Sequence, residues 1–155
     1  MNRTAAEIMT KAPLTVLHPQ DRVPRIAAAL RDNHVSAAPV VDEAGRLLGL
    51  VSESDLIRHL GDAETKRRAW WLELLSEGEG LAADFLDYLK EENRTAADVM
   101  KREVVTVAED TAVGEIVDLF ARHGIKRVPV LREGVLVGIV ARSDIIRALA
   151  APNPA

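Results

Sequence analysis

Hydrophobic and polar positions along this chain follow one pattern that occurs twice. Residues 49–60 read GLVSESDLIRHL, and residues 138–149 read GIVARSDIIRAL. Each stretch begins with a short apolar run, passes through a polar turn and continues with apolar residues at helical spacing. The pattern predicts a strand that leads directly into a helix, with Asp55 or Asp144 in the first helical turn.

The repetition extends upstream through three further pairs of segments. They are Thr4–Met9 with Thr95–Met100, Leu14–Val16 with Val105–Val107, and Val35–Val41 with Ile125–Leu131. The segments come in the same order in both copies, which indicates an internal duplication. A single copy is too short to bury both faces of a small sheet, so we expect the two copies to cover each other's apolar faces.

Both copies predict the same order of elements. A short strand around Thr15 or Thr106 comes first, then a helix, a hairpin and the final helix. The hairpin strands are expected at residues 38–41 and 47–51, and again at 128–131 and 136–140. Gly45 and Gly134 lie in the turns, where a positive φ is needed. The apolar positions of the middle helices are Val23, Ile26, Ala27 and Leu30 in the first copy, and Val113, Ile116, Val117, Leu119 and Phe120 in the second.

Composition and charge narrow the class of protein. The chain has 155 residues, of which 48% are hydrophobic and 28% charged, with a net charge of -4. This is a globular composition with enough apolar residues for a core. The mild acidity argues against a nucleic-acid binder that neutralises phosphates. No apolar run reaches the length of a membrane span, no signal-peptide core follows Met1, and there are no cysteines. We therefore expect a cytoplasmic protein without membrane contact.

The paired motifs resemble the cystathionine-β-synthase (CBS) domain, and the pair resembles a Bateman module. The resemblance rests on the Thr-Val segment, the Pro-Val strand and the Gly-to-Asp motif, twice and in order. It implies an α/β (α+β) fold of tandem β-α-β-β-α repeats, packed sheet to sheet about a pseudo-twofold axis. It also implies clefts between the repeats that bind adenosine-containing ligands such as AMP, ADP, ATP, NAD or S-adenosylmethionine. The domain boundaries we expect are 1–61 for the first repeat and 95–150 for the second.

Residues 62–94 form a segment that the minimal family pattern lacks, and we predict a helical insert there. Four of the five aromatic residues of the chain lie in it: Trp70, Trp71, Phe85 and Tyr88. They either pack the insert onto the repeats or form a dimer or partner surface, because aromatic residues are enriched at such contacts. Residues 151–155 read as a linker-like tail, a frayed end or the start of a linker to a further domain.

Asp55 and Asp144 are the first candidates for binding. An Asp in the first turn can simply cap its helix, and Ser52 lies at the spacing of a capping box. Asp144 favours a functional role, because Ala141 replaces the capping serine while the Asp is kept. By resemblance, each Asp accepts hydrogen bonds from ribose hydroxyls, and Ser52 lies near a ligand phosphate at the helix N-terminus.

Other candidate residues lie on the predicted strands. Lys126 and Arg127 are either a solvated charge pair or, by resemblance, phosphate contacts, and their counterparts are Ser36 and Ala37. The two clefts should therefore differ in ligand preference. By resemblance, Thr15 and Thr106 start their strands at the adenine pocket, although threonine is common in strands for structural reasons alone.

No catalytic or metal-binding pattern appears in the sequence. The four histidines show no paired spacing, and no serine lies in a nucleophile-elbow motif. We predict a regulatory, non-enzymatic module that senses an adenosyl ligand, needs no obligatory cofactor and forms a homodimer. The alternative is a nucleotide-independent interaction or dimerisation module that uses the aromatic insert, and a regulated protein partner is compatible with both.

Overall fold

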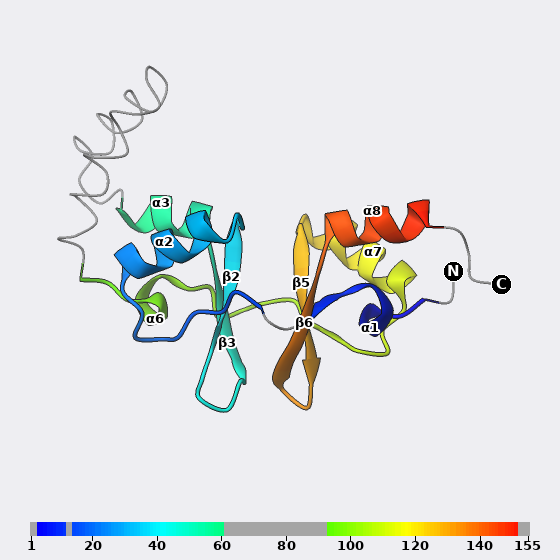
Figure 1. Ribbon diagram of the computed structural model, residues 1–155, viewed down its shortest axis with the longest axis horizontal. Helices are drawn as coiled ribbons and strands as arrows, with labels where there is room; N and C mark the ends of the chain where they lie inside the picture. Colours follow the sequence, from blue (N-terminus) through cyan, green and yellow to red (C-terminus); the bar gives the residue numbers. More distant parts are fainter. Residues whose placement is uncertain (1–2, 12–13, 61–92, 152–155) are drawn as a thin grey trace, which may run out of the picture. The chain divides into compact units, whose positions relative to one another are not determined.

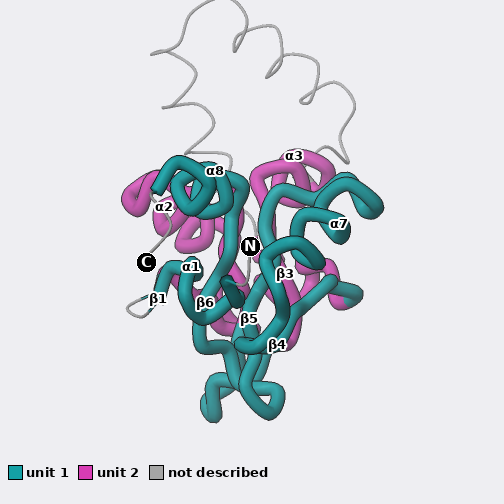
Figure 2. The backbone as a smooth tube through the Cα atoms, turned by 90° about the vertical axis from the view of Figure 1, so that its right-hand side faces the viewer, with its two compact units in different colours: residues 1–14, 41–47, 103–155 teal, residues 15–40, 48–102 magenta. Residues whose placement is uncertain are grey.

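The computed structural model describes residues 3–11, 14–60 and 93–151. These residues form two compact units (Figure 2). Unit 1 takes its described residues from Met1–Leu14, Val41–Leu47 and Glu103–Ala155, and unit 2 from Thr15–Val40 and Leu48–Arg102. Residues 62–92 of the predicted insert, with its four aromatic residues, lie outside the described residues. The predicted sheet-to-sheet packing of the two repeats stays a prediction.

Each unit takes its first helix from the other sequence repeat. Helix α1 (Ala5–Ile8) begins the first repeat but belongs to unit 1, while α6 (Ala96–Val99) begins the second repeat and belongs to unit 2. The backbone N–H of Ala5 donates to the carbonyl of Thr111 at 2.8 Å, and that of Ala96 donates to Asp21 at 2.8 Å. These bonds satisfy donors that a helix start leaves without an intrahelical partner.

Unit 1 contains a four-stranded sheet in the order β1-β6-β5-β4. Its strands are β1 (Thr10–Lys11), β4 (Val107–Ala108), β5 (Arg127–Arg132) and β6 (Val135–Ala141). Strands β4 and β5 are parallel, and α7 (Val113–His123) connects them, which gives the predicted β-α-β start. Strands β5 and β6 form the predicted hairpin. Its turn residues Glu133 and Gly134 both have positive φ, as a two-residue type I′ turn requires.

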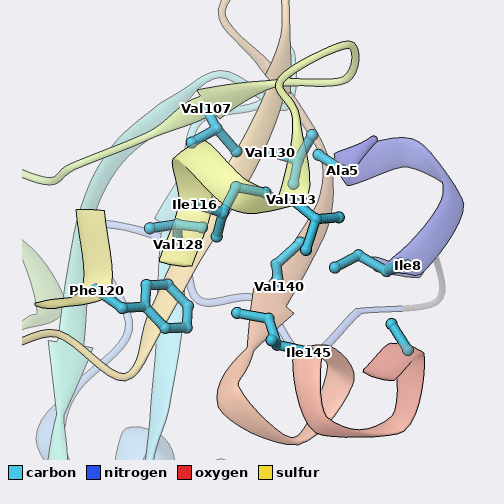
Figure 3. Close-up of a cluster of buried hydrophobic side chains, with 11 residues drawn as sticks. Ala5, Ile8, Val107, Val113, Ile116, Phe120, Val128, Val130, Val140 and Ile145 are labelled. Atoms are coloured by element: carbon cyan, nitrogen blue, oxygen red, sulfur yellow. The ribbon is translucent and has the colours of Figure 1, made fainter. Parts of the chain in front are cut away.

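The core of unit 1 lies between the sheet and three helices, α1, α7 and α8 (Arg142–Ala150) (Figure 3). Figure 1 shows these helices on one face of the β5–β6 hairpin. Helix α7 buries one stripe at positions i, i+3 and i+7, which matches an amphipathic helix on a sheet. Val117, which the periodicity placed among the apolar positions of α7, is instead 43% exposed. The buried residues are Ala5, Ile8, Val107, Val113, Ile116, Phe120, Val128, Val130, Val140, Ile145 and Ala148.

Unit 2 repeats this arrangement with less regular edges. It contains α2 (Val23–Asp32), α3 (Glu53–Leu60) and the β2–β3 hairpin, which is its sheet. The hairpin strands are β2 (Ala37–Val41) and β3 (Leu47–Ser52), of which Val41 and Leu47 belong to unit 1. Single bridges replace the outer strands: Leu17 pairs with Val40 in parallel, and Lys101 pairs with Leu50 in antiparallel orientation. The core is Leu17, Val23, Ile26, Leu30, Ala38, Val40, Val51, Leu56, Ala96 and Val99.

The predicted hairpins, the positive φ of Gly45 and Gly134 and the final helices are confirmed. The strand predicted around Thr106 is confirmed as β4, whereas the strand predicted around Thr15 is reduced to a single bridge at Leu17. Thr106 lies just before β4, and Thr15 lies in irregular backbone two residues before the Leu17 bridge. An edge segment has a partner on one side only, so one or two residues of pairing suffice there. Within the described ranges, no helix has the length and apolar character needed to cross a membrane.

Candidate ribose-binding carboxylates

Asp55 and Asp144 are the buried polar or charged residues of the described chain, with exposed fractions of 1% and 4%. Each is the third residue of its helix, α3 or α8, directly after the strand of the Gly-to-Asp motif. Burial of a carboxylate is costly unless hydrogen-bond donors surround it. The donors around each Asp therefore show which of its oxygens are already bonded within the protein.

Asp55 takes part in a complete capping box. Its Oδ2 accepts hydrogen bonds from the backbone N–H of Ser52 at 2.9 Å and from the Ser52 hydroxyl at 2.9 Å. The Ser52 Oγ in turn accepts a bond from the Asp55 backbone N–H at 3.2 Å. The Ser52 hydroxyl, predicted to lie near a ligand phosphate, is therefore engaged in fixing the helix start.

Asp144 caps its helix without a serine. Its Oδ2 accepts a hydrogen bond from the backbone N–H of Ala141 at 2.8 Å. This is the half of the capping box in which the carboxylate reaches back to the N-cap backbone, and it needs no hydroxyl at residue 141. The presence of Asp144 beside Ala141 thus has a structural explanation, which removes one argument from sequence for a ligand role.

The other oxygen of each carboxylate faces exposed donors. Asp55 Oδ1 lies 3.0 Å from Arg58 Nη2 and 3.9 Å from Lys101 Nζ. Asp144 Oδ1 lies 3.1 Å from Arg147 Nη1 and 3.3 Å from Thr10 Oγ1. The four donor residues are exposed at the surface. Each Oδ2 is thus held by the start of its own helix, and each Oδ1 by side chains of exposed residues.

Thr10 and Lys101 are contacts that the sequence analysis missed. They occupy equivalent positions, each directly after the Met that ends the Thr-to-Met segment of its repeat. Their backbones pair with equivalent strand residues, Thr10 with Ile139 and Lys101 with Leu50. The sequence did carry a clue to these contacts, because the two equivalent positions of the repeats hold different residue types, threonine and lysine.

The glycine that opens each Gly-to-Asp motif permits this approach. A Cβ on Gly49 would lie 2.6 Å from the carbonyl oxygen of Lys101 and 2.7 Å from Met100 Sδ. A Cβ on Gly138 would meet Met9 Sδ and would lie 3.0 Å from the carbonyl oxygen of Thr10. Both distances are shorter than normal van der Waals contact, so only glycine lets the segment with Lys101 or Thr10 cross its strand.

Lys126 also lies next to a helix start. Its carbonyl accepts a hydrogen bond from the Arg142 N–H at 3.1 Å, just as the Ser36 carbonyl accepts one from Glu53 at 2.9 Å. Lys126 is exposed and Arg127, the first residue of β5, is half-buried. The structure therefore brings this basic pair to the end of unit 1 that carries Asp144.

The adenine-pocket roles of Thr15 and Thr106 stay predictions. Thr106 is exposed and precedes β4, which is at the opposite edge of the unit 1 sheet from Thr10. Thr15 is half-buried in unit 2. Over the described ranges, no group of three or more His, Asp or Glu side chains is arranged to hold a metal ion.

The model of the CBS domain matches the chain twice, over residues 5–62 and 96–151. The chain belongs to the CBS domain family. Both matches include the CBS Gly-to-Asp motif with its buried carboxylate. Among curated proteins, MJ1426 of Methanocaldococcus jannaschii, itself uncharacterised, is 33% identical over 147 residues, which cover 90% of this chain and 87% of the relative.

Two solved CBS structures have the same fold. The chain matches CBSX2 in complex with AMP at a TM-score of 0.70 and 24% identity, over 94% of this chain and 95% of that one. It matches the CBS domain pair of protein MJ0100, in complex with 5′-methylthioadenosine and S-adenosyl-L-methionine, at a TM-score of 0.70 and 23% identity, over 96% and 97%. At these identities the similarity establishes the fold alone.

Proposed function

We propose that this CBS domain pair is a regulatory module that binds an adenosine-containing ligand. Asp55 and Asp144 accept hydrogen bonds from the ribose hydroxyls. One observation carries the proposal: each unit buries a carboxylate whose Oδ1 faces exposed donors at 3.0–3.9 Å. A carboxylate with two oxygens is well suited to a diol, because it accepts from both hydroxyls.

The relatives support the class of ligand. CBSX2 is solved with AMP, and the MJ0100 pair with 5′-methylthioadenosine and S-adenosyl-L-methionine. These ligands have adenosine in common and differ in charge, with a phosphate in one and none in another. The ribose of this shared adenosine is the group that the two Asp residues are proposed to bind.

The basic pair Lys126 and Arg127 is proposed to contact a phosphate where the ligand has one. The contact between the Lys126 carbonyl and the start of α8 supports this role, because a helix start also favours anions. Thr15 and Thr106 remain predicted adenine neighbours. Binding at both carboxylates would regulate by population shift, since a ligand stabilises the conformation that it prefers.

A thermal-shift screen with AMP, ADP, ATP, NAD and S-adenosylmethionine tests the proposal. A ligand at a hundredfold excess over its dissociation constant stabilises the folded protein by about 2.7 kcal/mol. We expect at least one of the five to raise the melting temperature by several degrees. If none does at millimolar concentration, the chain is not an adenosyl sensor, and the nucleotide-independent interaction module becomes the better account.

A further inference from the structure

The two carboxylates differ in how their hydrogen bonds are shared between the two oxygens. The described residues donate three hydrogen bonds to each carboxylate. Asp55 Oδ2 accepts two of them, from the Ser52 N–H and the Ser52 hydroxyl, and Oδ1 accepts one from Arg58. Asp144 Oδ2 accepts only the Ala141 N–H, and Oδ1 accepts from Arg147 and Thr10. Since each carboxylate oxygen has two lone pairs, Asp144 Oδ2 keeps one open, while both lone pairs of Asp55 Oδ2 are filled.

The strength of the donors widens the difference. Two cations face Asp55 Oδ1, Arg58 at 3.0 Å and Lys101 at 3.9 Å. One cation faces Asp144 Oδ1, and the other donor there is the neutral Thr10 hydroxyl at 3.3 Å. Exchange of one hydroxyl for another is close to neutral, whereas displacement of an ammonium gives up a charge-assisted contact.

We infer that Asp144 is the stronger ribose acceptor and that Ser52 and Lys101 weaken binding at Asp55, so that unit 1 fills first. This inference rests on the proposed function. It also changes the meaning of Ala141. The missing hydroxyl leaves a lone pair on Asp144 for the ligand, and the serine of the first repeat occupies the corresponding lone pair of Asp55.

The test uses adenosine, because an uncharged probe has no phosphate for Lys126 and Arg127 to contact. Calorimetry on Asp144→Asn isolates the Asp55 site, and calorimetry on Asp55→Asn isolates the Asp144 site. In the first background, Ser52→Ala and Lys101→Thr should each tighten binding by about three- to fivefold, the contribution of one exposed ion pair or hydrogen bond. In the second, Ala141→Ser and Thr10→Lys should each weaken it by a similar factor.

Two control variants separate this effect from changes in charge or helix propensity. Arg102→Thr removes a positive charge at the next residue, where Arg102 is exposed and donates to the Ala97 carbonyl. Ser54→Ala makes the serine change at an exposed position of the same helix. Neither should change adenosine affinity. Melting temperatures of all variants report whether each one folds. If an Asn background does not fold, the same substitutions are made in the otherwise wild-type chain. There, Ser52→Ala and Lys101→Thr should change the weaker of the two dissociation constants for adenosine, and Ala141→Ser and Thr10→Lys the stronger one.

Three results would overturn the inference. The first is that the four substitutions leave both affinities unchanged. The second is that Arg102→Thr acts as strongly as Lys101→Thr. The third is that the wild-type chain binds neither adenosine nor any of the five screened ligands, in which case the proposed function fails too. Binding that is intact but insensitive to Ser52 and Lys101 overturns the inference and leaves the proposed function standing.

Discussion

Gly49 has no room for a side chain, because the segment that carries Lys101 crosses directly over it. An added Cβ would lie 2.6 Å from a backbone carbonyl, which a change of rotamer cannot relieve. We expect Gly49→Ala to destabilise the fold by about 1–3 kcal/mol, the usual cost of overpacking. Urea denaturation measures the change in the free energy of unfolding.

Gly114 is the matched control, since nothing lies within 4 Å of an added Cβ there and the residue is exposed in α7. Gly114→Ala should leave stability unchanged or raise it by up to about 1 kcal/mol, because alanine favours a helix over glycine. Equal losses in the two variants would mean that the Gly49 contact is not the cause.

At the residue scale, the sequence located Asp55, Asp144 and Ser52 through their repeated motif, but not what surrounds them. Thr10 and Lys101 come from the opposite end of the repeat pattern, and the exchange of first helices between units brings them to the carboxylates. That exchange has no local signal. It depends on which surface each short helix covers, and tertiary packing alone decides this.

At the scale of elements, helices α2 and α7 end in the same way with different residues. The Val35 N–H donates to the Leu30 carbonyl at 3.0 Å, and Ile125 donates to Phe120 at 3.2 Å, as in a Schellman motif. The residue with positive φ is Gly124, at 62°, directly after α7, and His34, at 54°, two residues after α2. Histidine pays a steric cost in this conformation that glycine does not.

We therefore expect His34→Gly to stabilise the protein by about 0.5–1 kcal/mol, after allowance for the greater freedom of glycine in the unfolded chain. Gly124→Ala should destabilise it by about 1 kcal/mol, because alanine disfavours positive φ. Thermal unfolding of the two variants side by side measures both changes. A loss of stability in His34→Gly would show that the imidazole makes a contact worth more than the strain.

Helix α6 gives the fold a dependence on pH. The backbone N–H and hydroxyl of Thr95 donate to Asp98 Oδ2 at 2.8 and 3.0 Å, and these bonds lower the pKa of Asp98. Since the folded pKa lies below the unfolded one, the carboxylate stabilises the fold fully above about pH 4 and less as the pH falls through the folded value.

Unfolding of wild type and Asp98→Asn at a series of pH values measures this contribution. We expect the difference in unfolding free energy to be greatest near about pH 7 and to shrink below about pH 4, where the unfolded and then the folded carboxyl groups become protonated. A difference that stays constant across this range would assign the effect to packing instead of charge.

The sequence predicted most elements because their signals are local. Alternating apolar residues, the glycines of the turns and the Asp of each final helix fix the hairpins and helices. The strand expected around Thr15 was misplaced, because Thr-Val segments suit a strand wherever they lie, and only their partner decides which residues pair. Val117 was misassigned for a similar reason, since helical periodicity does not define the edge of the buried stripe.

At the scale of the whole molecule, unit 1 leaves apolar side chains exposed on its two longer helices. Val117 of α7 is 43% exposed, and Ile146 and Leu149 of α8 are 63% and 59% exposed. We propose a homodimer, the commonest closed assembly, in which such residues become buried. Sedimentation equilibrium at micromolar concentration should give twice the mass of the 16.9 kDa chain.

Ile146→Glu is the corresponding variant, because a charge in an apolar interface is unfavourable while the exposed position tolerates it in the folded monomer. It should sediment as a monomer. The control Arg122→Glu, a charge change at another exposed position of the same unit, should not alter the assembly. A wild-type mass near that of one chain at every concentration would contradict the homodimer.

The account as a whole depends on ribose recognition by buried carboxylates, and one calorimetric cycle tests it most directly. Wild type and Asp144→Asn are each titrated with AMP and with its 2′,3′-dideoxy analogue. We predict that the substitution weakens AMP binding by about tenfold, or about 1.4 kcal/mol, and leaves the weaker binding of the analogue unchanged. Equal effects on both ligands, or no effect on either, would show that Asp144 only caps its helix.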